Sequence, residues 1–134
     1  MADIKAFLMD NAFKTKSRHI CVSERFKDDD GETIMWEIAP ITERENEEIK
    51  RLSGFFDGCG KDSIEKYISR LCVKCVKYPD LEDISLQESY GVFGAETLVK
   101  SMLYAGEYAN LVKEIRDING FDKKLEDLKE EAKN

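Results

Sequence analysis

The residues whose types and spacing could support chemistry are few. Cys72 and Cys75 have the C-x-x-C spacing of a zinc ligand pair or a redox-active dithiol. Cys21 and Cys59 do not form a second such pair. Cys72 and Cys75 also fall on the apolar face of a helical repeat, where free cysteine behaves as a small apolar side chain. The sequence therefore favours buried thiols over metal or redox chemistry, and it predicts no structural disulfide in a cytoplasmic protein.

The single histidine, His19, restricts acid–base chemistry further. A histidine triad or a His-rich zinc site would depend on this one ring, which falls in a predicted strand beside apolar residues. The phosphate-binding patterns G-x-x-x-x-G-K-[ST] and G-x-G-x-x-G do not occur. We therefore expect no catalytic residue, no metal and no cofactor, and we interpret His19 as a structural or surface residue.

An acidic stretch has part of the spacing of a calcium-binding loop. If Phe26 is position one, Asp28, Asp30, Gly31 and Glu37 occupy positions three, five, six and twelve. The first position requires a carboxylate, and the flanking residues are predicted to be strands where a calcium loop has helices. We interpret the acids as turn formers, with Asp-Gly closing a hairpin.

The elements that position these residues follow from apolar periodicity. Alternating apolar side chains predict strands at about 18–26 and 33–39. A short helix is predicted from Asp3 to Phe13, and a further helix should run from the capping box Thr42-Glu43-Arg44-Glu45 to about Ser53. The glycine-rich stretch 54–60 divides this mixed part from a helical second half.

Helical spacing dominates the second half. The clearest repeat runs from Ile64 to Val76, with a cap at Asp62 and with Pro79 at or just beyond its end. A short helical turn is predicted at Ser85-Leu86-Gln87-Glu88. Two further helices, at about 98–103 and 108–118, are separated at Gly106 and should pair as an antiparallel hairpin.

These elements predict an α+β fold in which an N-terminal β-hairpin or small antiparallel sheet packs on a mainly helical C-terminal half. We expect a single domain over residues 1–134, with a hairpin-containing part (1–53), a helical part (61–120) and a charged helical tail (121–134). The apolar stripe of this tail is narrow. It can dock on the domain, fray in solution, or wait for a partner helix.

The net charge of −7 is concentrated in one region. Residues 28–48 hold nine acidic residues and one basic residue, Arg44. Such a segment repels phosphate, so we expect no nucleic-acid partner, and its acids form either a solvated face or a match for a basic protein surface. No apolar run approaches the ~20 residues of a membrane span, and Met1-Ala2-Asp3-Ile4-Lys5 does not resemble a secretion signal. We therefore expect a cytoplasmic protein without a membrane partner.

The order of short motifs along nearly the whole chain resembles the XkdN-like family of phage tail assembly chaperones, found in long-tailed phages and prophages of Gram-positive bacteria. The motifs that carry the resemblance are Ser23-Glu24-Arg25-Phe26-Lys27-Asp28, Trp36-Glu37-Ile38, Ile41-Thr42-Glu43, Tyr78-Pro79-Asp80-Leu81, Ser89-Tyr90-Gly91, Met102-Leu103, Gly106-Glu107-Tyr108 and Ala132-Lys133-Asn134.

The resemblance implies a non-enzymatic assembly factor of the bacterial host cytoplasm that is absent from the mature virion. Its partners would be the tape measure protein and the major tail tube protein, which it helps to recruit. Many phage tail chaperones are made in two lengths by ribosomal slippage, so the resemblance also implies a frameshift-extended longer form as a partner. Ala132-Lys133-Asn134 can be encoded by GCA-AAA-AAC, which contains the slippery heptamer A-AAA-AAC; the other interpretation is a plain stop after a charged tail. The alternative is a small structural or adaptor subunit of the tail that stays in the virion.

Side-chain type gives a hypothesis for the partner-binding residues. Methionine adapts to different partners, and tyrosine combines an apolar ring with a polar hydroxyl, which favours the two helices near Gly106 together with the C-terminal stripe. For most of these residues a place in the core is the favoured interpretation over a binding surface. Self-association also stays open. The candidates are Met102, Leu103, Tyr104, Tyr108, Leu111, Phe121, Leu125 and Leu128.

Overall fold

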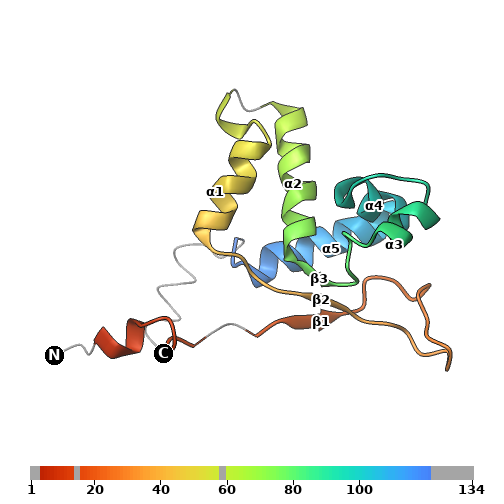
Figure 1. Cartoon of the computed structure of the whole chain (residues 1–134), viewed down its shortest axis with the longest axis horizontal. Coiled ribbons are helices and arrows are strands. Elements are labelled where there is room, and N and C mark those ends of the chain that lie inside the picture. The colour runs from red at the N-terminus through yellow and green to blue at the C-terminus, as the bar shows by residue number, and fades with distance from the viewer. Residues whose placement is uncertain (1–3, 14–15, 58–59, 122–134) are drawn as a thin grey trace.

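Three short strands form an antiparallel sheet in the order β1-β2-β3 in the computed structural model, which describes residues 4–13, 16–57 and 60–121 (Figure 1). In the central strand, Trp36 and Ile38 are buried while Glu37 between them is not, because successive side chains point to opposite faces. Ile20 of β1 lies opposite Trp36. The strands are β1 Arg18–Ile20, β2 Trp36–Ile38 and β3 Val76–Tyr78.

The predicted hairpin is confirmed, with strands shorter than predicted. Beyond β1 and β2 the two segments are joined by a bridge between Lys27 and Thr33 and by a hydrogen bond from the Ile34 amide to the Phe26 carbonyl (2.8 Å). Gly31 has φ of 80°, the left-handed conformation that the predicted turn requires.

One short helix precedes β1, three lie between β2 and β3, and three follow β3 in the described part of the chain. They are η1 Ile4–Phe7, α1 Glu43–Leu52, η2 Phe55–Asp57, α2 Lys61–Cys75, α3 Ile84–Ser89, α4 Ala95–Met102 and α5 Ala105–Ile118. The predicted capping box of α1 is confirmed, since the Glu45 amide donates to Thr42 Oγ1 (3.2 Å) and the Thr42 amide donates to Glu45 Oε1 (3.1 Å). Figure 1 shows α1 and α2 side by side on one side of the sheet.

Three predicted helix boundaries were wrong. Helix α2 begins after Gly60 instead of at a cap formed by Asp62. Helix α3 is capped by Asp83, whose carboxylate accepts from the Leu86 amide (2.9 Å), and not by Ser85. The break between α4 and α5 lies before Ala105, so that Gly106 falls inside the first turn of α5. Each shift is small, as expected where neighbouring residues are able to cap the same helix.

Two features of the helical half differ more substantially from the prediction. Helix α2 ends at Cys75, and Val76–Tyr78 extends to pair with β2 as the third strand. The following Pro79 favours an extended residue before it, so a strand is compatible with the sequence there. Helices α4 and α5 pack more closely on α2 than on each other, which corrects the predicted antiparallel hairpin.

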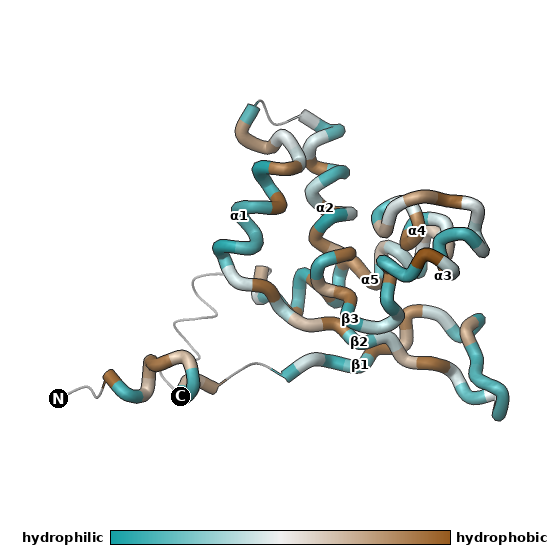
Figure 2. The backbone as a smooth tube through the Cα atoms, viewed as in Figure 1, coloured by the Kyte–Doolittle hydropathy of each residue, from teal (hydrophilic) through white to brown (hydrophobic). Residues whose placement is uncertain are grey.

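The core lies between the sheet and helices α2, α4 and α5. Trp36 and Ile38 of the sheet belong to one buried cluster with Cys72, Leu98 and Leu111. Because sheet and helices share this cluster, the predicted α+β class is confirmed. Helix α1 is mostly hydrophilic along its outer side (Figure 2).

The N-terminal segment, residues 4–13, extends away from this core (Figure 1). The helix predicted from Asp3 to Phe13 is reduced to η1, and all described residues of the segment are exposed. A short helix without a surface to pack on is marginal in water, which explains the reduction. Among the described residues, no helix is both long enough and apolar enough to cross a bilayer.

Candidate functional site

The groups that could have supported bond chemistry are separated by the fold. Cys72 and Cys75 are fully buried, as predicted, and burial raises the pKa of the Cys72 thiol to about 12. His19 is exposed on β1. Asp28 accepts hydrogen bonds from the amides of Asp30 (2.9 Å) and Glu32 (3.0 Å), which confirms its role as a turn former. In the described part of the chain, no three His, Cys, Asp or Glu side chains converge in a group that could hold a metal ion.

The structure instead contains an apolar pocket where the hairpin meets the segment after β3. The cavity measures about 180 Å³ and is walled almost entirely by carbon. Trp36 and Met102 are buried at its base, whereas Tyr78 is 52% exposed and stands at its edge. The lining residues are Phe26, Ile34, Trp36, Tyr78, Pro79, Leu86 and Met102.

The hairpin supplies one wall of the pocket. Phe26 and Ile34 lie on opposite strands of the hairpin, and the hydrogen bond from the Ile34 amide to the Phe26 carbonyl holds them side by side. The Phe26 ring packs against Trp36 with ring centroids 6.2 Å apart and planes tilted by 44°, a favourable geometry for an aromatic pair. This wall is therefore fixed by both backbone pairing and ring packing.

The segment from Pro79 to Leu86 supplies the opposite wall. Gln87 holds this segment in place, because its buried side chain donates to the Leu81 carbonyl (2.9 Å) and accepts from the Gly94 amide (3.0 Å). The Gln87 side chain thereby joins the loop before α3 to the start of α4. Leu86 is half-buried beside it and faces the cavity.

Arg25 connects the hairpin to the turn between α4 and α5. Its guanidinium donates to the Met102 carbonyl (2.9 Å) and pairs with Glu107, and it lies 4.2 Å from the centre of the Tyr104 ring. Hydrogen bonds from Arg25, then from Ser23, hold the pKa of Glu107 at about 2. Met102, at the base of the pocket, is thus fixed in two ways: Arg25 of the hairpin binds its carbonyl, and its side chain packs in the core.

Of the residues predicted to bind a partner, the structure buries some in the core and leaves others exposed. Met102, Leu103 and Leu111 are buried in the core cluster, with Met102 alone lining the pocket. Tyr108 is partly buried, and its hydroxyl forms a hydrogen bond with the Cys72 thiol.

Tyr104 (68% exposed) and Phe121 (39% exposed) remain accessible, while Leu125 and Leu128 lie outside the described residues. The helix pair near Gly106 is therefore mainly a core element whose exposed end is Tyr104. A contribution of the accessible candidates to partner binding stays a prediction.

Of the residues that line the apolar pocket, only Met102 was predicted from the sequence to bind a partner. The predicted hairpin ended one strand at about Phe26 and began the next at about residue 33, which was the available signal for one wall. The second wall depends on β3 pairing with β2, and β3 was predicted as the end of a helix. Without that strand, Tyr78 and Pro79 could not be brought beside Trp36.

A larger surface groove, of about 440 Å³, lies over α1 and the end of α2. Its apolar floor consists of Ile49 and Leu52, and the remaining lining residues are charged. Lys74 and Glu45 within it are already paired (3.4 Å). The smaller pocket is the better candidate for apolar recognition, because its walls have few polar groups to desolvate.

Comparison with known proteins then decides the family. The chain matches the family described as "Phage XkdN-like tail assembly chaperone protein, TAC" over residues 4–133. The chain belongs to this family. The family is non-enzymatic, in agreement with the absence of catalytic motifs from the sequence. The predicted resemblance is therefore confirmed.

Relatives in Bacillus subtilis (strain 168) align along almost their whole length. The phage-like element PBSX protein XkdN is 33% identical over 141 residues, which covers 98% of this chain and 94% of that protein. The protein YqbN is 31% identical over 140 residues, covering 98% and 93%. A crystal structure of YqbN has a TM-score of 0.81 with this chain, at 24% identity, and covers 91% of this chain and 99% of that one. The last comparison shows that the fold is shared.

Proposed function

We propose that this tail assembly chaperone holds the tape measure protein in the host cytoplasm, helps recruit tail tube subunits, and is absent from the finished particle. The observation that carries the proposal is the apolar, aromatic-walled pocket between Phe26 and Leu86. Membership of a non-enzymatic chaperone family supports it. A tape measure protein is long and helical, and exposed apolar surface makes such a chain prone to aggregate until the tail encloses it.

The size of the pocket suits a side chain better than a small molecule. At about 180 Å³ it is smaller than the roughly 300–1,000 Å³ of typical small-molecule sites. One leucine- or phenylalanine-sized anchor would contribute about 1.5–3 kcal/mol on burial. A contact of this strength exchanges readily, which suits a chaperone that has to leave its partner before the particle is finished.

The test is co-expression with the tape measure protein of the same phage. We expect the wild-type chain to keep that protein soluble and to co-purify with it, and Tyr78→Ala to lose much of both effects. Phe56→Ala is the control, since Phe56 is an exposed aromatic residue (66%, against 52% for Tyr78) that lies in η2 and does not line the pocket. Both variants should retain the thermal midpoint of the wild type.

Two results would contradict the proposal. Equal losses for Tyr78→Ala and Phe56→Ala would remove the pocket from the mechanism. Detection of the chain in purified virions at stoichiometric levels would favour the alternative of a structural or adaptor subunit.

A frameshift-extended longer form is a further proposed partner. It is supported by the codons available for Ala132-Lys133-Asn134, which permit the slippery heptamer. A gene that reads GCG-AAG at the first two of these positions would overturn this part of the proposal. Mass spectrometry of the expressed products would detect the longer form directly.

A further inference from the structure

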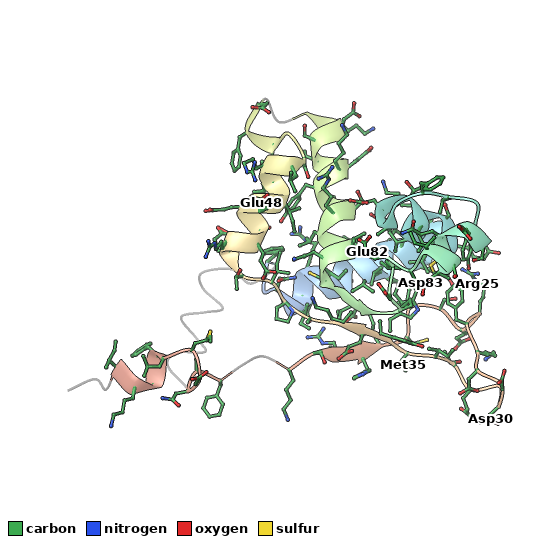
Figure 3. All side chains as sticks on the ribbon, viewed as in Figure 1. Arg25, Asp30, Met35, Glu48, Glu82 and Asp83 are labelled. Atoms are coloured by element: carbon green, nitrogen blue, oxygen red, sulfur yellow. The ribbon has the colours of Figure 1, made fainter. Side chains whose placement is uncertain are left out.

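The apolar pocket lies between two acidic segments. Phe26 and Ile34 stand at the base of a turn that contains Asp28, Asp29, Asp30 and Glu32. On the other side, Pro79 and Leu86 bracket a segment that contains Asp80, Glu82 and Asp83. Figure 3 shows Asp30 at the outer end of the hairpin and Glu82 and Asp83 around α3, on the same side of the molecule.

Little positive charge balances these acids. Arg25, next to Phe26 in the chain, is paired with Glu107. Lys27 and Lys77 donate to neutral oxygens, Thr33 Oγ1 (3.3 Å) and the Lys74 carbonyl (3.3 Å), and so keep their positive charges, but they are only two against the seven acids of the two segments. Residues 78–99 contain no lysine or arginine. The seven acids of the two segments therefore outnumber the unpaired basic side chains beside them, and the surroundings of the pocket are negative.

We propose that the occupant of this pocket is an amphipathic protein segment with an apolar anchor for the pocket and lysine or arginine on both sides of that anchor. This inference rests on the proposed function, and it names the chemistry that such a partner must present. The apolar anchor supplies the affinity, and the flanking positive charges select the segment and align it between the hairpin turn and the start of α3.

Other occupants fit the surface less well. A nucleic acid or an anionic membrane would be repelled by both acidic segments. The N-terminal segment of a second copy offers apolar side chains, but residues 4–13 contain one lysine and one aspartate and have no net charge. A basic amphipathic segment alone matches both the apolar cavity and its charged surroundings.

The mechanism predicts a specific salt dependence. Complementary charges at the edge of an interface act mainly by accelerating association. Exposed charges are screened over about 8 Å at physiological ionic strength and about 3 Å at 1 M salt. The preference for basic segments should therefore be large in dilute buffer and small in concentrated salt, while the apolar contribution persists.

The experiment uses the full chain and two synthetic amphipathic helical peptides with the same leucine and phenylalanine face. One peptide carries lysines on its polar face and the other carries glutamates. By fluorescence anisotropy, we expect the lysine peptide to bind at least about tenfold more tightly at low salt, with the difference reduced to about twofold near 1 M salt.

A triple charge reversal tests the acidic segments directly. Asp29→Lys, Asp30→Lys and Glu82→Lys change exposed acids whose carboxylates are not used to cap the turns, unlike those of Asp28 and Asp83. The preference for the lysine peptide should disappear or invert in this variant. The control triple, in which the exposed acids Glu47, Asp57 and Asp62 of the α1–α2 region become lysine, has the same net charge and should keep the preference.

The outcomes separate this inference from the proposed function. Equal binding of both peptides by the wild type, with loss in Tyr78→Ala, would overturn the charge inference and leave the pocket proposal standing. An equal change in both triple variants would also overturn it, because net charge alone would then explain the preference. Failure of both peptides to bind, together with no effect of Tyr78→Ala on the tape measure protein, would overturn both.

Discussion

Arg25 of the hairpin and Glu107 of α5 are 82 residues apart in the chain and form an ion pair through two nitrogens of the guanidinium. The same arginine donates to the Met102 carbonyl and stacks on Tyr104. One side chain therefore fixes the hairpin to the turn between α4 and α5. The pocket depends on this link, because its hairpin wall and its base come from these two parts of the chain.

The ionised Glu107 side chain should make stability depend on pH. Hydrogen bonds from Arg25 and Ser23 lower its pKa from 4.5 to about 2. A carboxyl group with a lowered native pKa stabilises the fold fully above its unfolded pKa and loses that contribution as the pH falls towards the native pKa. We predict that the stability difference between wild type and Glu107→Gln is constant above pH ~5 and shrinks between pH ~4.5 and ~2.

Urea unfolding at each pH measures this difference. The Arg25→Gln background provides the control, since the pH-dependent part should be much smaller once the main hydrogen-bond donor is absent. A difference that stays constant down to pH ~2 would show that Glu107 is not held as the structure indicates.

Alanine substitutions at Leu111 and Tyr104 should show which residues of the predicted partner-binding set belong to the core, through their different effects on the free energy of unfolding. Leu111 is completely buried, so Leu111→Ala should lower the free energy of unfolding by about 2–5 kcal/mol. Tyr104 is mainly exposed and contributes its stacking on Arg25, so Tyr104→Ala should cost about 1 kcal/mol or less. Chemical denaturation of both variants checks the order, and similar losses would place Tyr104 in the core.

Trp36 offers a test of whether the chain is a single domain. It is the only tryptophan and lies in the cluster that joins the sheet to α2, α4 and α5. We predict that Trp36 fluorescence and far-ultraviolet circular dichroism report one coincident unfolding transition. Separate midpoints for the two signals would show that the sheet and the helices unfold independently.

The parts of the fold that were predictable are those that depend on local signals. The capping box at Thr42 and the turn at Gly31 are encoded by adjacent residues, and both were predicted correctly. The third strand was not, because Val76 continues the helical repeat and becomes extended only through pairing with β2. The pocket was missed for the same reason, since its second wall follows that strand. Methionine and tyrosine content alone indicated Met102 but did not distinguish its buried position from a surface one.

The thiols should differ sharply in reactivity. Cys72 and Cys75 are buried, and burial raises the pKa of both thiols, whereas Cys21 is exposed. In a Cys59→Ser variant, we predict that an aromatic disulfide reagent modifies Cys21 rapidly and the other two only at the rate of unfolding. Rapid modification of Cys72 or Cys75, located by peptide mapping, would contradict their burial and reopen the question of redox chemistry.

The N-terminal segment should contribute little to the stability of the fold. Phe7 and Phe13 are exposed, at 74% and 105%, and no residue of η1 is buried. We predict that the double substitution Phe7→Ser and Phe13→Ser changes the free energy of unfolding by no more than ~0.5 kcal/mol. Phe26→Ser is the control, because this half-buried ring packs on Trp36 and its loss should cost about 1–3 kcal/mol. A loss in the double variant as large as that of Phe26→Ser would mean that the segment packs on the body of the protein in solution, and its apolar side chains would then be part of the core and not of a surface open to partners.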